Sequence, residues 1–356
     1  MSSAVGAAGV GSWPELLTTV LRGDDMVAAD AAWAMSQIMT GEVTPVQVAG
    51  FLVALRAKGE TPDEVSGLAA MMVECANPVP PVGEALDIVG SGGDRAHTVN
   101  ISTMSAIVAA ASGVRVAKHG NRAASSSCGA ADLLEELGVA IDLDGAGVAA
   151  CVERAGIGFC FAPVFHPGFR FAGVARRELG IGTVFNFLGP LTNPAKPTAH
   201  AVGVADPRMA SVVASVLAKR GSRALVFRGD DGLDELTTTT TSSVWVVSGG
   251  EVTTVKLDPT DLGLAPVARG DLRGGDAAYN AEVARSLLAG DRGPVRDTVL
   301  LNAAAGVVAF EGPDASRLVE QLSAAMQTCA AAIDDGSAAA KLDTWVGASQ
   351  LAKQRE

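Results

Sequence analysis

The chain has 356 residues, of which 48% are hydrophobic and 4% are aromatic, and its formal net charge is −12 at neutral pH. This negative charge argues against attraction to nucleic acid or to an anionic membrane surface, and the scarcity of aromatic residues argues against stacking on nucleobases. The length allows two or three domains with a sizeable core.

The cysteines and the amino terminus indicate a cytoplasmic protein. The five cysteines form no C-x-x-C pair and are odd in number, so we expect buried thiols in a reducing compartment. No apolar run approaches the roughly 20 residues of a membrane span, and the first residues lack the features of a signal peptide. Residues 1–11 are rich in Ala, Gly and Ser, and we expect a disordered lead-in there.

Helix-start signals recur over residues 12–80, which we predict to form a small helical domain. Each signal is a hydroxyl residue followed three positions later by an acid or amide. The pairs are Ser12 with Glu15, Thr44 with Gln47, and Thr61 with Glu64. Several of these helices are apolar nearly all round, so we expect them to pack against each other or against a partner chain.

After residue 80 the pattern changes to alternating strands and helices, which is typical of an α/β domain with a mostly parallel sheet. The predicted strands cover residues 85–89, 115–120, 157–162, 199–205 and 223–229. Residues 243–257 form a predicted hairpin that turns at Gly249 and Gly250. The chain ends in helices.

The first candidate site is the stretch GSGGDRAHTVNIST, residues 90–103, which follows a buried strand. Glycines there let the backbone turn sharply and approach a ligand, and the following helix offers its N-terminus to an anion. Arg95 stands where a dinucleotide fingerprint needs its third glycine, and no Gly-Lys-Ser/Thr follows, so neither common nucleotide motif fits. A phosphate-binding loop and a ligand-free tight turn both remain open.

Polar residues in the next two stretches suit the same ligand. Asn100 or Ser102 can cap the following helix. Ser102 can instead be a ligand of Mg²⁺. In KHGNRAASSSCG, Lys118 ends a buried strand, where a lysine is costly unless it is paired. Ser125 and Ser126 can donate hydrogen bonds to phosphate oxygens. The alternative is that this stretch is a polar loop followed by a serine-rich helix start.

Two further stretches carry charged side chains. GDDGLDE, residues 229–235, places four carboxylates in six residues after a strand, as either a solvated acidic turn or a Mg²⁺ site with Asp234 and Glu235 as ligands. Arg176 and Arg177 have no carboxylate one turn earlier on their predicted helix. Either arginine can bind a substrate carboxylate, or it can form an ion pair with an acid such as Glu178.

Taken together, these motifs resemble those of the anthranilate phosphoribosyltransferases over most of the chain. GSGGD differs from the family's usual GTGGD by Ser91, which keeps the hydroxyl, and NIST, KHGNRAASS, GTVFNFLGPLTNP and DDGLDE match in order and spacing. The resemblance implies Mg²⁺-dependent attack of the anthranilate amine on C1 of phosphoribosyl pyrophosphate. It also implies a homodimer, and an active site between the helical and α/β domains.

The resemblance implies roles for residues matched one by one. The donor would be held by Gly90, Gly93, Asp94, Thr98, Asn100, Ile101, Ser102, Thr103, Lys118, His119, Gly120, Asn121, Arg122, Ala123, Ala124, Ser125, Ser126 and Ala130. Two Mg²⁺ ions would be held by Ser102, Asp234 and Glu235. Anthranilate would be lined by Gly90, Asn121, Ala162, Pro163, His166, Phe169, Arg176 and Gly189, with Arg176 on its carboxylate.

Two positions depart from the family pattern. Phe169 stands where relatives often carry tyrosine, and Ala130 stands where a serine is common. No residue is identified as a certain catalytic acid or base, since positioning and charge neutralisation suffice for loss of pyrophosphate.

Domain boundaries and alternative functions complete the expectations. The helical domain is expected over 12–80 with a returning segment near 180–198, and the α/β domain over 81–179 and 199–356. A pyrimidine nucleoside phosphorylase shares this architecture but would lack the DDGLDE metal pair. A non-catalytic nucleotide-binding or regulatory subunit is the second alternative, and the intact candidate metal ligands argue against it.

Overall fold

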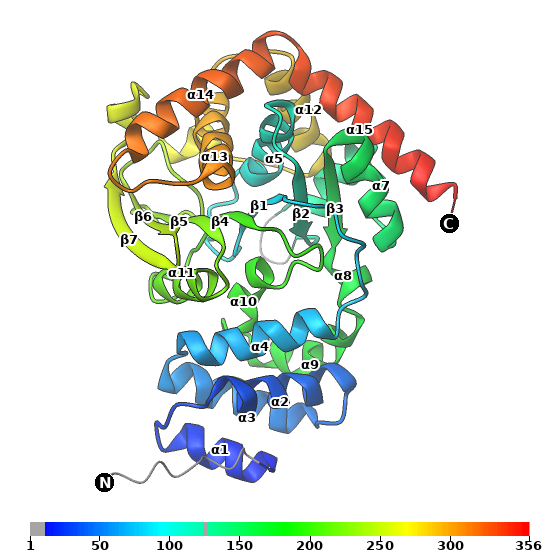
Figure 1. Cartoon of the computed structure of the whole chain (residues 1–356), viewed down its shortest axis with the longest axis vertical. Helices are drawn as coiled ribbons and strands as arrows, with labels where there is room; N and C mark the ends of the chain where they lie inside the picture. Colours follow the sequence, from blue (N-terminus) through cyan, green and yellow to red (C-terminus); the bar gives the residue numbers. More distant parts are fainter. Residues whose placement is uncertain (1–10, 124–126, 356) are drawn as a thin grey trace. The chain divides into compact units, whose positions relative to one another are not determined.

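The computed structural model describes residues 11–123 and 127–355, and it divides the chain into two compact units (Figure 1). The helical unit consists of Met1–Ala76 and His166–Leu188, and the α/β unit consists of Asn77–Phe165 and Gly189–Glu356. The predicted lead-in, residues 1–11, lies almost entirely outside the described residues. A small helical part and a larger α/β part confirm the predicted fold class.

Capping and close helix contacts shape the helical unit. Thr44 and Thr61 form complete capping boxes with Gln47 and Glu64, whereas Ser12 makes no capping hydrogen bond. Helix α2 packs closely on α4. Glycine at position 67 permits this approach, because a side chain there would collide with the Ala28 carbonyl. The helices are α1 (Trp13–Leu21), α2 (Ala28–Thr40), α3 (Pro45–Lys58), α4 (Pro62–Glu74), α9 (Arg170–Leu179) and α10 (Phe185–Leu188), with a 3₁₀ turn η1 at Pro167–Phe169.

The returning segment differs from the prediction. The chain enters the helical unit at His166 and leaves it after Leu188, whereas the prediction placed the return near 180–198. Helix α9 packs against α2 and α3, so residues 166–179 belong to the helical unit rather than to the α/β unit. Side-chain packing decides this boundary.

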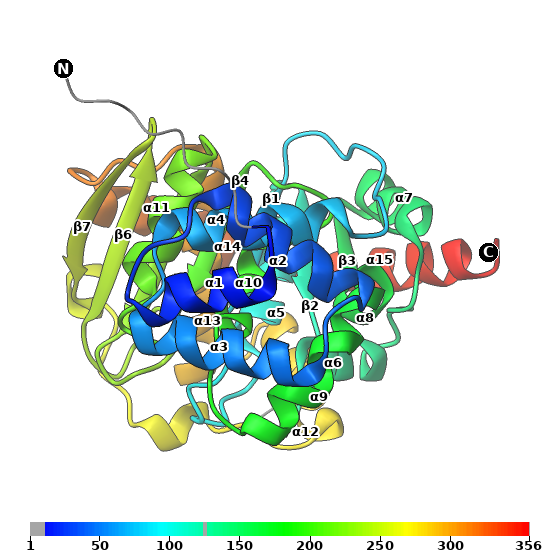
Figure 2. The same ribbon diagram turned by 90° about the horizontal axis from the view of Figure 1, so that it is seen from below.

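A seven-stranded sheet forms the centre of the α/β unit, in the order β3-β2-β1-β4-β5-β6-β7. The first five strands in this order are parallel, and β5, β6 and β7 pair antiparallel. Figure 2 shows β6 and β7 as a long pair at one edge. The strands are β1 (Leu86–Gly90), β2 (Val116–Gly120), β3 (Ile157–Phe161), β4 (Ala199–Gly203), β5 (Arg223–Gly229), β6 (Ser242–Ser248) and β7 (Glu251–Leu257).

The predicted strands and the hairpin are therefore confirmed. Gly249 and Gly250 both have positive φ, 59° and 82°, as a two-residue hairpin turn of type I′ requires. The parallel strands are almost wholly buried, because helices cover both faces of such a sheet.

The helices of the α/β unit form two layers around the sheet. Helices α5 and α13 lie over one face and α11 over the other (Figure 1). The helices are α5 (Ile101–Ala111), α6 (Ala130–Glu136), α7 (Gly145–Ala155), α8 (Ala162–Phe165), α11 (Ala210–Lys219), α12 (Ala277–Leu288), α13 (Pro294–Glu311), α14 (Leu318–Asp334) and α15 (Ser337–Lys353). Short 3₁₀ turns are η2 (Gly189–Leu191), η3 (Pro259–Leu262) and η4 (Arg269–Leu272). Among the described residues, every helix is too short or too polar to cross a bilayer.

Candidate active site

The strand order places a topological switch between β1 and β4. The chain builds β1, β2 and β3 outward in one direction and then returns to add β4 and β5 on the other side of β1. Ligands of open α/β sheets bind outside the carboxyl ends of the strands at such a point, since the loops diverge there. Gly90 and Gly203 end β1 and β4 in register, so both face this point.

The loop after β1 is held in an unusual backbone conformation. Gly92 and Gly93 have φ of 71° and 88°, a region that favours glycine, and Arg95 and His97 also have positive φ. The Gly92 amide donates to the Asp234 carboxylate at 2.6 Å. The glycines therefore permit a sharp turn that brings the loop against the acidic segment after β5.

Asn100 and Thr103 lie at the start of α5, and neither side chain caps the helix. Asn100 occupies the N-cap position of α5 without a capping bond, because its carboxamide bonds the Cys128 carbonyl at 3.0 Å and the Asn280 side chain at 2.8 Å. The Thr103 hydroxyl is buried without a hydrogen-bond partner among the described residues. A buried hydroxyl of this kind is costly to leave unmatched, so it suits an incoming acceptor such as a phosphate oxygen.

Lys118 is buried in the middle of β2 rather than at the strand's end, with its Nζ 2.5 Å from the Ile88 carbonyl and 3.4 Å from Ser102 Oγ. Burial lowers the pKa of Lys118, while Asp87 and Glu235 act in the opposite direction. The structure thus provides the pairing that the sequence required for a lysine at this position. It also aims the ammonium group at the start of α5.

Asp87, near the start of β1, connects β2 to the segment after Gly189. Its carboxylate accepts from the His119 amide at 3.1 Å and from the Asn193 side chain at 2.9 Å, and burial raises its pKa to about 6. His119 Nδ1 lies 3.0 Å from the Gly189 carbonyl. Predicted donor residue His119 and predicted anthranilate residue Gly189 are therefore in direct contact.

The loop between β2 and α6 is anchored by Asp132. Its carboxylate accepts from the amides of Ala123 and Gly129 at 2.9 and 2.8 Å and pairs with Arg122 at 2.9 Å. Arg122 also pairs with Glu135 at 2.8 Å, so its guanidinium is committed to these acids. Asn121 is exposed, and Ala130 begins α6. Predicted donor residues Ala124, Ser125 and Ser126 lie outside the described residues.

Asp234 and Glu235 are buried beside the glycine loop. The Asp234 carbonyl packs against Gly203, and its carboxylate packs against Gly90, so that a side chain at either glycine would collide with it. Burial and the nearby Asp94 raise the pKa of Asp234. Burial and Asp234 raise the pKa of Glu235, although Lys118 and the Ser102 amide oppose this. Asp234 and Glu235 are therefore not solvated, whereas Asp230 in the same stretch is exposed.

These carboxylates fit a divalent cation that arrives with a diphosphate. Asp94, Asp234 and Glu235 are mutually repulsive, and added positive charge would relieve that repulsion. Within the described ranges, no three acidic, His or Cys side chains already form a complete metal cluster. Mg²⁺ usually binds one or two carboxylates and takes its remaining oxygens from water and phosphate, so an open set of this kind suits it.

Arg176 lies on α9 in the helical unit and stacks on two aromatic rings. Its guanidinium is 4.8 Å from the centre of the Phe169 ring and 5.5 Å from that of Phe185. The two rings meet edge to face at 5.1 Å. No carboxylate pairs with Arg176 among the described residues, and burial lowers its pKa. The guanidinium is therefore held on an apolar platform, and its donors are not used by a neighbouring acid.

The predicted anthranilate residues are divided between the two units. His166, Phe169 and Arg176 belong to the helical unit. Gly90, Asn121, Ala162, Pro163 and Gly189 belong to the α/β unit, where Ala162 directly follows β3. Gly90 ends β1 and Asn121 follows β2. Ala162 and Pro163 follow β3, and Gly189 contacts His119 near the end of β2.

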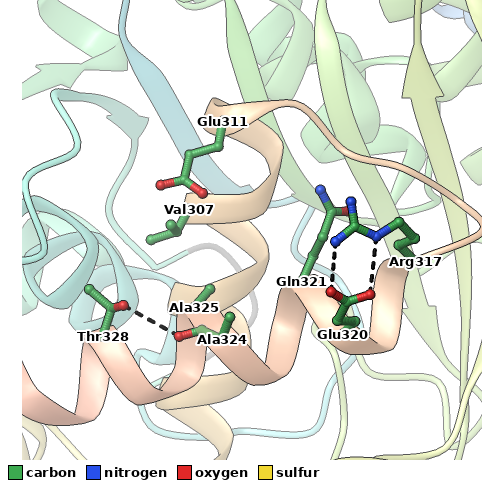
Figure 3. A pocket seen from close by; sticks show the side chains of 8 residues that line it. All are labelled: Val307, Glu311, Arg317, Glu320, Gln321, Ala324, Ala325 and Thr328. Carbon is green, nitrogen blue, oxygen red and sulfur yellow. Dashed lines mark hydrogen bonds and ion pairs between the residues drawn. The ribbon is translucent and has the colours of Figure 1, made fainter.

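A small cavity between α13 and α14 lies apart from these residues (Figure 3). Its volume is about 210 Å³, and its lining includes Glu311, Arg317, Glu320 and Gln321. Arg317 pairs with Glu320 at 2.6 Å, so two of its charges neutralise each other. It contains none of the predicted site residues.

Sequence reasoning missed three buried polar residues that hold the site. Asp87 in β1 binds Asn193 in the segment after η2, and Asn280 on α12 binds Asn100. Asp87 could have been found, since an acid inside an otherwise apolar strand needs partners. Asn193 and Asn280 carry no such local signal.

Comparison with known proteins extends these observations. Residues 82–339 match the model of a glycosyl transferase family, a/b domain, and residues 14–76 match that of the same family's helical bundle domain. The chain is 70% identical to the anthranilate phosphoribosyltransferase of Acidothermus cellulolyticus over 96% of each chain. It is 58% identical to that of Thermobifida fusca, over 96% of this chain and 99% of the relative.

Solved structures of the same enzyme are also similar to this chain. The anthranilate phosphoribosyltransferase of Thermus thermophilus superposes with a TM-score of 0.86 at 41% identity, covering 94% of this chain and 99% of that one. The Saccharomyces cerevisiae enzyme in complex with PRPP and Mg superposes with a TM-score of 0.85 at 26% identity, covering 95% and 98%.

Proposed function

This chain belongs to the anthranilate phosphoribosyltransferase family, and from that premise we propose how its residues carry out the family's reaction. The enzyme transfers the phosphoribosyl group of phosphoribosyl pyrophosphate to the amine of anthranilate, in a Mg²⁺-dependent step of tryptophan biosynthesis. The observation that carries the assignment of the donor site is the meeting of the glycine loop, Lys118 and the acidic pair at the switch point of the sheet.

The donor's phosphates bind the loop after β1 and the start of α5. The exposed backbone at Gly93 and the N-terminus of α5 supply N–H groups for phosphate oxygens. The Thr103 hydroxyl, which has no hydrogen-bond partner among the described residues, adds a hydrogen bond, and the Lys118 ammonium adds a positive charge. The other matched residues within 90–103 and 118–123, together with Ala130, complete this site.

Ser102, Asp234 and Glu235 hold two Mg²⁺ ions. When bound, Mg²⁺ stabilises the negative charge of the departing pyrophosphate. The carboxylates of Asp234 and Glu235 are buried and mutually repulsive, which supports this role. The residues themselves act by position and charge, and none is required as a strong base because the aniline nitrogen is already nucleophilic.

Arg176 binds the carboxylate of anthranilate. Its freedom from ion pairs among the described residues and its stacked, partly buried guanidinium support this role. Phe169 supports Arg176 through its ring rather than through a hydroxyl contact to the substrate.

The protein is a cytoplasmic homodimer. Leu21, Val46 and Val53 on α1 and α3 of the helical unit are exposed by 75%, 80% and 42%, which favours burial against a second copy. All five cysteines are free thiols, four of them buried and Cys75 half-buried, in keeping with a reducing compartment.

Anthranilate fluorescence tests the reaction. Purified protein should quench it only when phosphoribosyl pyrophosphate and Mg²⁺ are both present, and omission of either should leave the signal constant. Phosphate with a pyrimidine nucleoside should release no base. Release of base without consumption of anthranilate would establish the phosphorylase, and donor binding without any turnover would establish a binding protein.

A further inference from the structure

We propose that Asn302 on α13 is a positioning residue for the acidic pair, acting through the backbone of Leu236. This inference rests on the proposed roles of Asp234 and Glu235 in binding Mg²⁺. Asn302 is fully buried, 66 residues from Leu236 in the chain, and belongs to none of the motifs that indicate the function.

The contact engages both polar backbone groups of one residue. Asn302 Oδ1 accepts from the Leu236 amide at 2.9 Å, and Asn302 Nδ2 donates to the Leu236 carbonyl at 2.9 Å. Nδ2 also donates to the Thr298 carbonyl at 2.9 Å, which fixes the carboxamide on its own helix. Because paired bonds define orientation as well as distance, the peptide planes on either side of Leu236 are fixed relative to α13.

The segment that carries the carboxylates needs such an anchor. Residues 230–241 contain no helix or strand, so no ladder of backbone bonds holds them. The side chains of Asp234 and Glu235 repel each other in a buried place, and this repulsion favours a loop that opens. Glu235 is bonded directly to Leu236, with Cα atoms about 3.8 Å apart, so a shift of Leu236 moves the Glu235 carboxylate.

Neighbouring contacts give the anchor a second point on the same helix. Thr298 lies one turn before Asn302, and its hydroxyl bonds that of Thr238 at 2.7 Å. On the other side of the pair, Asp231 accepts from the Leu233 amide at 3.1 Å. The acidic pair is thus flanked by the bonded residues Leu233 and Leu236, and Leu236, which Asn302 binds, directly follows Glu235.

A pure packing role makes a different prediction. An apolar residue at 302 could fill the space, but the buried amide and carbonyl of Leu236 would lose their partners and the loop would move to find others. A positioning role therefore shows itself in metal binding, and a packing role shows itself only in stability.

Calorimetry without anthranilate separates these cases. Wild type and Asn302→Ala are titrated with phosphoribosyl pyrophosphate at stepped Mg²⁺ concentrations, so no turnover occurs. We expect Asn302→Ala to raise the Mg²⁺ concentration that supports half-maximal donor affinity by roughly tenfold, as loss of an outer partner of a metal ligand does. Hydrogen exchange of residues 233–238 in the metal-free protein should also become faster.

Three companion variants make the outcome decisive. Thr298→Val, which keeps the side-chain shape, should give a smaller shift in the same direction and serves if Asn302→Ala does not fold. Ser349→Ala removes a buried hydroxyl that accepts from the Ala140 amide, and it should lower the melting temperature without changing the Mg²⁺ dependence. The double variant Asp234→Asn with Glu235→Gln removes both carboxylates and shows how donor binding depends on Mg²⁺ when the acidic pair is lost completely.

An unchanged Mg²⁺ dependence in a destabilised Asn302→Ala and in Thr298→Val would overturn the positioning role. Failure of the wild type to bind the donor with Mg²⁺ would instead overturn the proposed function. Slow exchange at Leu236 in the metal-free wild type supports the anchor independently of catalysis.

Discussion

At the scale of single residues, the environment of Arg176 distinguishes a binding group from a surface charge. Arg177, the next residue on α9, is exposed, whereas Arg176 is partly buried on Phe169 and Phe185. Holding a guanidinium in this way costs solvation, and a carboxylate-bearing ligand would restore it.

Arg176→Ala is expected to raise the KM for anthranilate by roughly 10- to 100-fold, since a hydrogen bond to a charged group contributes about 1.5–3 kcal/mol. The KM for the donor should change far less. Initial rates with one substrate varied at a time provide the measurement. Arg177→Ala is the matched control and should behave as wild type, and an equal rise of both KM values would contradict the assignment.

Phe169 has a role that does not need a hydroxyl. Phe169→Leu should raise the KM for anthranilate about two- to fivefold with kcat little changed, because a cation–π contact contributes about 0.5–1 kcal/mol at partly exposed sites. Phe169→Tyr keeps the ring and should match wild type. A large effect of the tyrosine, with none for the leucine, would show that the position contacts the substrate directly.

At the scale of elements, close backbone approach at the strand ends determines where the loops lie. Gly203 ends β4, and the Asp234 carbonyl occupies the space that a side chain would need. The segment that carries Asp234 and Glu235 therefore lies directly against the switch point, and this close approach depends on glycine at position 203.

Gly203→Ala should destabilise the protein by roughly 1–3 kcal/mol, as overpacking does, and should weaken donor binding by displacing Asp234. Urea denaturation and donor calorimetry would report the two effects. Gly347→Ala is the control, because it lies in α15 with nothing within 4 Å of an added Cβ. It should leave binding unchanged and stabilise the protein by roughly 0.5–1 kcal/mol. Wild-type donor affinity in Gly203→Ala would argue against the tight fit.

At the scale of the whole molecule, the two units differ in the kind of surface they expose. Exposed large apolar side chains in the helical unit include Leu21 on α1 and Val46 on α3, while Val252 on β7 is exposed in the α/β unit. Because seven of the exposed large apolar side chains named for the described residues belong to the helical unit and three to the α/β unit, we expect self-association through the helical unit.

Wild-type protein should sediment with twice the chain mass, and Val46→Glu should shift it towards the monomer because a charge would be buried in the interface. Val252→Glu places the same charge on the other unit and should leave the mass at two chains. Sedimentation equilibrium over a range of concentrations measures both. A dimer that resists Val46→Glu but is lost in Val252→Glu would place the interface on the α/β unit.

The sequence by itself predicted the features that depend on neighbours along the chain. The alternation of apolar and polar residues and the turn residues located all seven strands. The spacing of a hydroxyl residue and an acid or amide located the caps of α3 and α4. The order of the motifs also indicated the family, because residue types at short spacing carry that information directly. These features depend on local backbone preference and on burial, and both follow from the residue types along the chain.

Only the tertiary structure decided which distant groups meet. Asp234 binds an amide 142 residues away at Gly92, and Leu236 depends on Asn302 at a separation of 66. The returning segment begins at His166 because α9 packs on α2 and α3, and the letters near 180–198 do not record that packing. Hydrogen bonds and steric fit act through space, so a residue such as Asn302 acquires its role only when the folded chain brings its partner into contact.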